Sequence, residues 1–129
     1  MALDVDLLED EVLAFLAESH LASLTTRRPD GTPHVAPVGF SYDADARLAR
    51  IITFPAARRI QHIGDGAHVA LCQIDGGRWL TLEGRATVTD DPARVAEAVR
   101  RYAQRYRQPG DRPDRLAIEV QVTRMMGRA

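Results

Sequence analysis

The chain has 129 residues, of which 45% are hydrophobic and 27% charged, and its formal net charge at pH 7 is −1. These values fit one globular domain covering residues 1–129. Because there is no excess of positive charge, neither nucleic acid nor an acidic membrane is favoured as a partner, and a bound anion would need a local basic patch.

Cysteine and histidine content narrows the possibilities further. Cys72 is the only cysteine, which excludes an intramolecular disulfide, and the four histidines have neither paired cysteines nor an HExxH spacing. We therefore predict no metal site. The first residues lack the basic and long apolar regions of a signal peptide, and no run reaches 18 apolar residues, so we expect a reduced, cytoplasmic setting.

The first elements are a helix and a hairpin. Asp6 to Ser19 carries apolar residues at helical spacing, which predicts an amphipathic helix packed on a sheet. The run Leu21–Thr26 and the residues from Val35 to Tyr42 then flank a turn at Pro29-Asp30-Gly31. The returning strand contains Pro33 and Pro37, each of which removes a backbone donor, so this strand is expected at an edge or a bulge.

A strand from Leu48 to Phe54 is followed by a short helix, predicted over Pro55–Ile63. Arg58 and Arg59 lie near the start of this helix, where a positive charge is unfavourable for the helix dipole. One explanation is an anion site in which the arginines supplement free backbone N–H groups. The other is a solvated surface pair, and the spacing favours neither.

The next strands run from His68 to Ile74 and from Arg78 to Val88, joined by a turn at Asp75-Gly76-Gly77. Gly84 interrupts the second strand and predicts a bulge or a bend. Trp79 lies just after the turn, where core or dimer packing is favoured over stacking on a planar ligand.

The last elements are a long helix and a strand. Asp91 and Pro92 form a strong helix start, with an apolar stripe and a basic surface following, and the strand is predicted from Leu116 to Thr123. The segment between them is expected to be a loop. The stripe comprises Val95, Ala96, Val99, Tyr102, Ala103 and Tyr106, and the basic surface comprises Arg94, Arg100, Arg101, Arg105 and Arg107.

Strands outnumber helices, and tight turns join several of them, so we predict a mainly β fold in which an antiparallel sheet closes as a small barrel with flanking helices. No G-x-S-x-G, Walker or G-x-G-x-x-G motif is present. The catalytic residues are therefore unknown from sequence. An edge strand with prolines, an arginine pair and an aromatic after a turn together favour a cofactor-binding protein, without indicating which cofactor.

Several stretches resemble a known family. They are His20-Leu-Ala-Ser-Leu-Thr-Thr-Arg27, Pro33-His-Val-Ala-Pro-Val-Gly-Phe40, the segment from Cys72 to Ala86, Arg101-Tyr-Ala-Gln-Arg-Tyr-Arg107 and Ile118-Glu-Val-Gln-Val122. Together they resemble the flavin and deazaflavin split-barrel superfamily that includes pyridoxamine 5′-phosphate oxidases, and look most like the actinobacterial F420-dependent biliverdin reductase group.

The resemblance implies a homodimeric split β-barrel with cofactor sites at the subunit interface, and hydride transfer from reduced F420 to a planar, biliverdin-like small molecule. Relatives commonly carry Lys where this chain has Arg59, which keeps the charge of the phosphate site but changes its geometry, since a guanidinium binds bidentately. His62 likewise stands where many relatives have Asn. The cofactor-binding residues that the resemblance implies are His34, Val35, Ala36, Pro37, Val38, Ile52, Thr53, Arg58, Arg59, Gln73, Arg78 and Trp79, the last three from the other subunit's side.

Two other functions stay open from the sequence. One is an FMN-dependent oxidase or reductase on the same barrel, and the other is a module that binds or stores F420 or another planar ligand without catalysis. His34 has two equally weighted roles, as a contact to the ring or substrate and as a solvent-facing strand residue.

Overall fold

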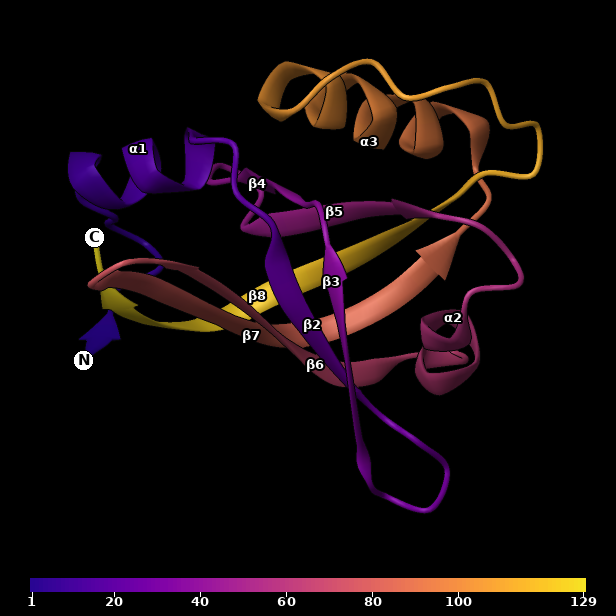
Figure 1. The fold of residues 1–129 in the computed structure, drawn as a ribbon, viewed down its shortest axis with the longest axis horizontal. Helices are drawn as coiled ribbons and strands as arrows, with labels where there is room; N and C mark the ends of the chain where they lie inside the picture. Colours follow the sequence, from indigo (N-terminus) through magenta and orange to yellow (C-terminus); the bar gives the residue numbers. More distant parts are fainter.

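The computed structural model describes all residues from 1 to 129 and consists of one curled antiparallel sheet with three helices outside it (Figure 1). No helix in it has the length and apolar character needed to cross a membrane. In chain order the elements are β1 (Ala2–Leu3), α1 (Asp10–Ala17), β2 (Ala22–Arg27), β3 (Pro33–Val38), β4 (Ser41–Asp43), β5 (Leu48–Thr53), α2 (Arg58–Ile63), β6 (Ala67–Asp75), β7 (Arg78–Thr89), α3 (Pro92–Arg105) and β8 (Leu116–Arg128).

A two-residue connection joins the two end strands of the sheet. Its strand order is β3-β2-β6-β7-β8-β5-β4, with β1 added to β8, so β3 and β4 lie at opposite ends of this order although only Gly39 and Phe40 separate them in sequence. The sequence predicts one continuous strand here, and that prediction is wrong. The chain leaves one end of the sheet and enters the other, which gives a barrel split between β3 and β4 and confirms the predicted fold.

The barrel interior is filled by the inward side chains of the strands and by the buried side chains of α1. Val12, Phe15 and Leu16 of α1 pack into the same buried cluster as Leu71 and Leu82 of the central strands. Burial of these apolar surfaces is the main stabilising contribution. The helix begins at Asp10 rather than at Asp6, because Asp4 accepts the main-chain N–H of Asp6 at 2.9 Å and so holds the preceding residues in a turn.

The helix α3 begins where the sequence predicts, since the Asp91 carboxylate accepts the N–H of Arg94 at 3.0 Å and Pro92 follows the cap. Its predicted surface is partly wrong. Ala96 is exposed, whereas Arg105, expected on the solvated face, is only 9% exposed and points into the protein. The helix packs across β4, β5 and β8. Arg105, at the end of the helix, donates to Phe40 O and so lies at the split in the barrel.

The strand β8 extends five residues beyond the predicted end. A bulge opposite Gly84 interrupts the alternation of inward and outward residues from which that end was predicted. Glu83 pairs with Arg124 and Gly84 pairs with Val122, so Thr123 is the extra residue and reverses the in-out alternation after it. The bulge predicted at Gly84 is confirmed. The first half of β8 is buried on both faces rather than half-buried, since α3 covers its outer side and Arg94 pairs with Glu119.

Gly84→Ala is expected to destabilise the fold by about 3 kcal/mol, because a Cβ at this position would overlap the main-chain oxygen of Gln121 and lie 2.9 Å from the Val122 Cα. Urea denaturation monitored by circular dichroism measures the change. Gly110→Ala is the matched control, since no atom lies within 4 Å of the Cβ it would add. Equal stability of the two variants would show that the bulge relaxes freely.

Candidate functional site

The arginine pair lies where β5 leaves the sheet. β5 ends at Thr53, a turn closed by the Ala57 N–H donating to Phe54 O at 3.1 Å follows, and α2 begins at Arg58. The helix has six residues and begins at Arg58 rather than at Pro55, so its predicted start is wrong. Arg59 donates from Nε to Thr53 Oγ1 at 3.3 Å, and its half-buried position lowers its pKa.

A polar cleft opens beside this pair. It has a volume of about 590 Å³ and lies between the β2–β3 turn, β3 and α2. Two arginines, Arg28 and Arg58, and two histidines, His34 and His62, contribute to its walls, and Pro29 and Gln61 complete them. No acidic residue lines it, which makes the cleft suited to a negatively charged ligand.

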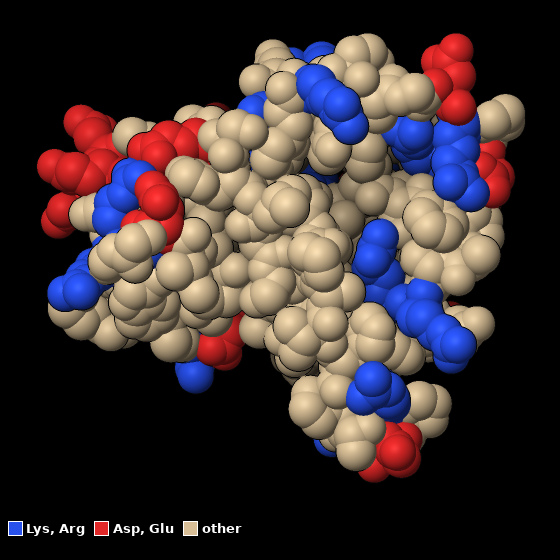
Figure 2. Space-filling model, viewed as in Figure 1, with Lys and Arg blue, Asp and Glu red and all other residues tan.

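The arginines in and beside the cleft have no acidic partner. Neither Arg28, Arg58 nor Arg59 forms an ion pair with a carboxylate. In contrast, Arg100 and Arg101 of α3 both pair with Glu97. Figure 2 shows basic side chains spread over the side of the molecule that carries α2 and the β2–β3 hairpin. The surface arginines of α3 are mostly neutralised locally, whereas those of the cleft keep their charge available.

An apolar groove of about 350 Å³ lies on the outer face of β2, β3 and β6. Leu21, Val35 and Ile74 in it are 62%, 59% and 66% exposed, a high value for large apolar side chains. Ala36 and Pro37 also line it, and β3 is the end strand of the sheet, as its two prolines predict. Apolar side chains along a strand edge form a surface on which a flat ring system can lie.

The structure brings together only part of the predicted site. His34 and Arg58 line the cleft, and the hydrogen-bonded pair of Arg59 and Thr53 lies beside it. The apolar groove is lined by Val35, Ala36 and Pro37. Val38 faces the core and is 5% exposed, while Ile52 is half-buried on β5. Arg78 and Trp79 lie at the β6–β7 turn, at the opposite end of the sheet from α2 (Figure 1), so one chain does not join them to the cleft.

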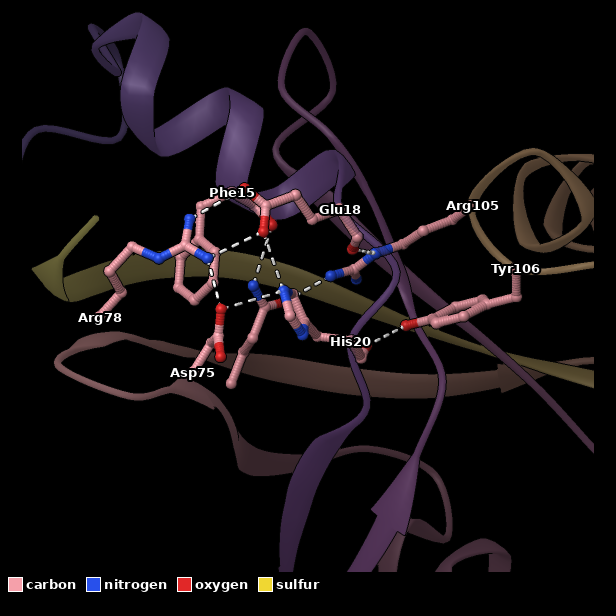
Figure 3. A network of polar contacts seen from close by, with 8 residues as sticks. Phe15, Glu18, His20, Asp75, Arg78, Arg105 and Tyr106 are labelled. Atoms are coloured by element: carbon pink, nitrogen blue, oxygen red, sulfur yellow. Dashed lines mark hydrogen bonds and ion pairs between the residues drawn. The ribbon is translucent and has the colours of Figure 1, made fainter.

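Gln73 needs a correction, since it is fully buried and has no surface to offer a cofactor. Its amide donates to Phe15 O at 2.9 Å and accepts from Arg105 at 2.5 Å. Arg105 also donates to Glu18 O and Phe40 O, both at 2.7 Å. This buried network ties α1, α3 and the split of the barrel together (Figure 3), and we leave Gln73 out of the cofactor site.

Arg78 is also held by neighbouring side chains. It donates to both oxygens of Glu18 at 2.8 and 2.9 Å and to Asp75 at 2.5 Å, and its guanidinium lies 4.3 Å from the centre of the Phe15 ring (Figure 3). The hydrogen bonds from Arg78 and His20 lower the pKa of Glu18 to about 2. Arg78 therefore fixes the end of α1 to the β6–β7 turn in the isolated chain.

Sequence reasoning did not include Arg28, Gln61 and His62 among the cofactor-binding residues. Arg28 is the first residue after β2, in the turn of the hairpin, and it lines the cleft together with residues of α2. His62 is one turn after Arg58 on α2, and this i, i+4 spacing is the signal that places both side chains on one face.

Comparison with known proteins agrees with this fold. Residues 8–128 match the model of the pyridoxamine 5′-phosphate oxidase family. A curated protein of Mycobacterium tuberculosis (strain CDC 1551 / Oshkosh), an F420H(2)-dependent biliverdin reductase, is 48% identical over 122 residues, covering 95% of this chain and 89% of that protein.

Two solved structures extend the comparison. A structure described as an F420 reductase is 28% identical, with a TM-score of 0.69 over 88% of this chain and 94% of that one. A conserved hypothetical protein from Mycobacterium tuberculosis is 19% identical, with a TM-score of 0.80 over 95% of this chain and 84% of that one. This second likeness shows a shared fold and nothing more. With its split barrel and a match over nearly its whole length, the chain belongs to the pyridoxamine 5′-phosphate oxidase family.

Proposed function

We propose that this protein is an F420-dependent oxidoreductase that reduces a planar conjugated small molecule, with a biliverdin-like tetrapyrrole as the best candidate. The observation that carries the proposal is the acid-free cleft with its unpaired arginines, adjoining the edge strand that bears the apolar groove. The 48% identical F420H(2)-dependent biliverdin reductase supports this choice of cofactor and substrate class.

The residues fit the parts of this cofactor. F420 has a phosphodiester and a glutamyl tail, both anionic, and a flat deazaflavin ring. Arg28, Arg58 and Arg59 would bind the anionic groups through guanidinium N–H donors, which hold phosphate oxygens in pairs. Val35 and Pro37 would contact the ring and exclude water from one face of it. Reduced F420, when bound, supplies the hydride, and the protein supplies orientation.

We further propose that the active form is a homodimer, supported by the exposed apolar residues Leu21, Val35 and Ile74 on the outer face of the sheet. A second copy on this face would cover them and could bring its own Arg78 and Trp79 to the cofactor. Sedimentation velocity at micromolar concentration tests this, and a monomer under conditions that support turnover contradicts it.

The enzymatic proposal predicts that the protein oxidises reduced F420 in the presence of biliverdin, followed by the absorbance of oxidised F420. Parallel reactions without protein and without biliverdin give the uncatalysed rates. Tight F420 binding without turnover on biliverdin or other planar acceptors would indicate a binding or storage module instead.

An FMN-dependent oxidase or reductase is the second candidate, because the family model that matches is named for pyridoxamine 5′-phosphate oxidase. Side-by-side titration of the protein with F420 and FMN separates the two. We expect tighter binding of F420, and a yellow purified protein with a flavin spectrum would favour FMN.

A further inference from the structure

The His62 side chain is held in a fixed orientation within the cleft. Its Nδ1 lies 2.8 Å from Thr26 Oγ1, and Thr26 is only 2% exposed, on the inner face of β2. The hydroxyl can donate to an unprotonated Nδ1 or accept from a protonated one, so this contact is kept in both charge states. Because Thr26 occupies Nδ1, the opposite ring nitrogen, Nε2, is the one left for a ligand.

The surroundings of His62 are almost entirely basic or neutral. The His34 ring of β3 lies 4.9 Å away, edge to face, and Arg28 and Arg58 share the same cleft. On the β7 side, the Arg85 guanidinium lies against Gly66, three residues after α2. Burial, and then His34, Arg28 and Arg58 in that order, lower the pKa of His62 below its usual 6.5.

The nearby carboxylates, Asp30 and Asp65, do not line the cleft. In the β2–β3 turn, Asp30 accepts from both the N–H and the hydroxyl of Thr32, at 3.0 and 2.6 Å. Asp65, just after α2, forms no ion pair. An anion entering the cleft would therefore be the main negative charge facing His62.

From this geometry we propose that anion binding in the cleft is coupled to uptake of one proton by His62, whose Nε2–H then donates to the bound anion. The inference rests on the proposed function in that this cleft is the one assigned to the phosphodiester of the cofactor. It makes His62 a binding residue whose charge appears together with the ligand.

The sign of the pH dependence follows from linkage. In the empty cleft the neutral imidazole is favoured by burial and by neighbouring positive charge, and a bound anion reverses the second effect and raises the pKa of His62. Affinity is then highest below the pKa of the empty protein. It falls by roughly tenfold per pH unit between that pKa and the pKa of the complex, and becomes constant above the latter.

The test uses inorganic sulfate, which stays doubly charged throughout the pH range of interest. The full-length protein is titrated by NMR, following the four histidine rings, with saturating sodium sulfate and with sodium chloride at equal ionic strength. We expect sulfate to raise the pKa of His62 by about one unit or more, which corresponds to a tenfold or larger preference of the anion for the charged form. His62→Gln assigns the resonance by removing it.

Two variants make the result specific. His62→Gln keeps a partner for Thr26 and is expected to bind sulfate with an affinity that no longer changes with pH. His68→Gln removes an exposed histidine of β6 that does not line the cleft, and is expected to behave as the native protein. Circular dichroism verifies that both variants fold.

Several results would overturn the inference. They are an unchanged His62 pKa in sulfate, equal shifts of all four histidines, which indicate general screening, and pH-dependent affinity that survives in His62→Gln but disappears in His34→Gln. The F420 assay is independent of these results. Failure to oxidise F420 with a normal sulfate response would contradict the proposed function alone, and turnover with no sulfate response would contradict the inference alone.

Discussion

Arg59→Ala is expected to weaken F420 binding by roughly 10- to 100-fold while leaving the fold intact. Hydrogen bonds to charged groups are worth about 1.5–3 kcal/mol, and this substitution removes those from one guanidinium to the anionic part of the cofactor. Within the protein, the side chain makes a single hydrogen bond, the 3.3 Å contact to Thr53 Oγ1, so little stability depends on it. Fluorescence titration of F420 measures the change.

Two controls separate charge from geometry at this position. Arg59→Lys keeps the positive charge but loses the paired donors, so we expect an intermediate affinity. Arg107→Ala removes an exposed arginine after α3 that forms no ion pair, and is expected to leave binding unchanged. If Arg59→Ala titrates like the native protein, the phosphate site lies elsewhere.

Arg105→Met is expected to lower the free energy of unfolding by about 3–5 kcal/mol, the largest stability effect that we predict. The substitution removes three hydrogen bonds and leaves Glu18 O and the Gln73 amide oxygen without their donor, while Phe40 O keeps only the 3.2 Å hydrogen bond from the Tyr106 hydroxyl. The guanidinium also lies 4.6 Å from the centre of the Phe40 ring, a favourable cation–π distance. Urea denaturation measures the loss.

A double variant tests whether unsatisfied groups cause this loss. In Arg105→Met/Gln73→Leu the amide left without a partner is removed as well, so the double variant should be more stable than the sum of the two single losses predicts. Arg107→Ala, two residues further on, is the control and should change stability by less than about 0.5 kcal/mol. Strict additivity would show that Arg105 and Gln73 do not act together.

Local signals predicted most of the fold correctly. The Asp91-Pro92 cap, the prolines of β3 and the bulge at Gly84 all depend on the chemistry of one or two neighbouring residues, and all three are confirmed. The errors concern interactions between distant segments. β1 is two residues long and exists through its pairing with the end of β8, and β4 separates from β3 because it pairs with β5.

The buried polar residues show why the site was predicted only in part. In the sequence, Gln73 looks like a polar strand residue available to a ligand, yet it alternates in register with the inward-facing Val69 and Leu71. Similarly, Arg105 continues the helical stripe of Ala98 and Tyr102 at spacings of seven and three. Their positions on the inner face could be predicted from periodicity, but the partner that makes burial of each one tolerable comes from a different element.

The position of β8 between β7 and β5 has a consequence for biosynthesis. Residues 116–128 are made after every other strand, yet they join the half of the sheet containing β3, β2, β6 and β7 to the half containing β5 and β4. A nascent chain that ends before residue 116 has two unconnected half-sheets with open edges. The barrel can therefore close only after β8 leaves the ribosome exit tunnel, and until then the exposed edges of β7 and β5 can pair with other chains.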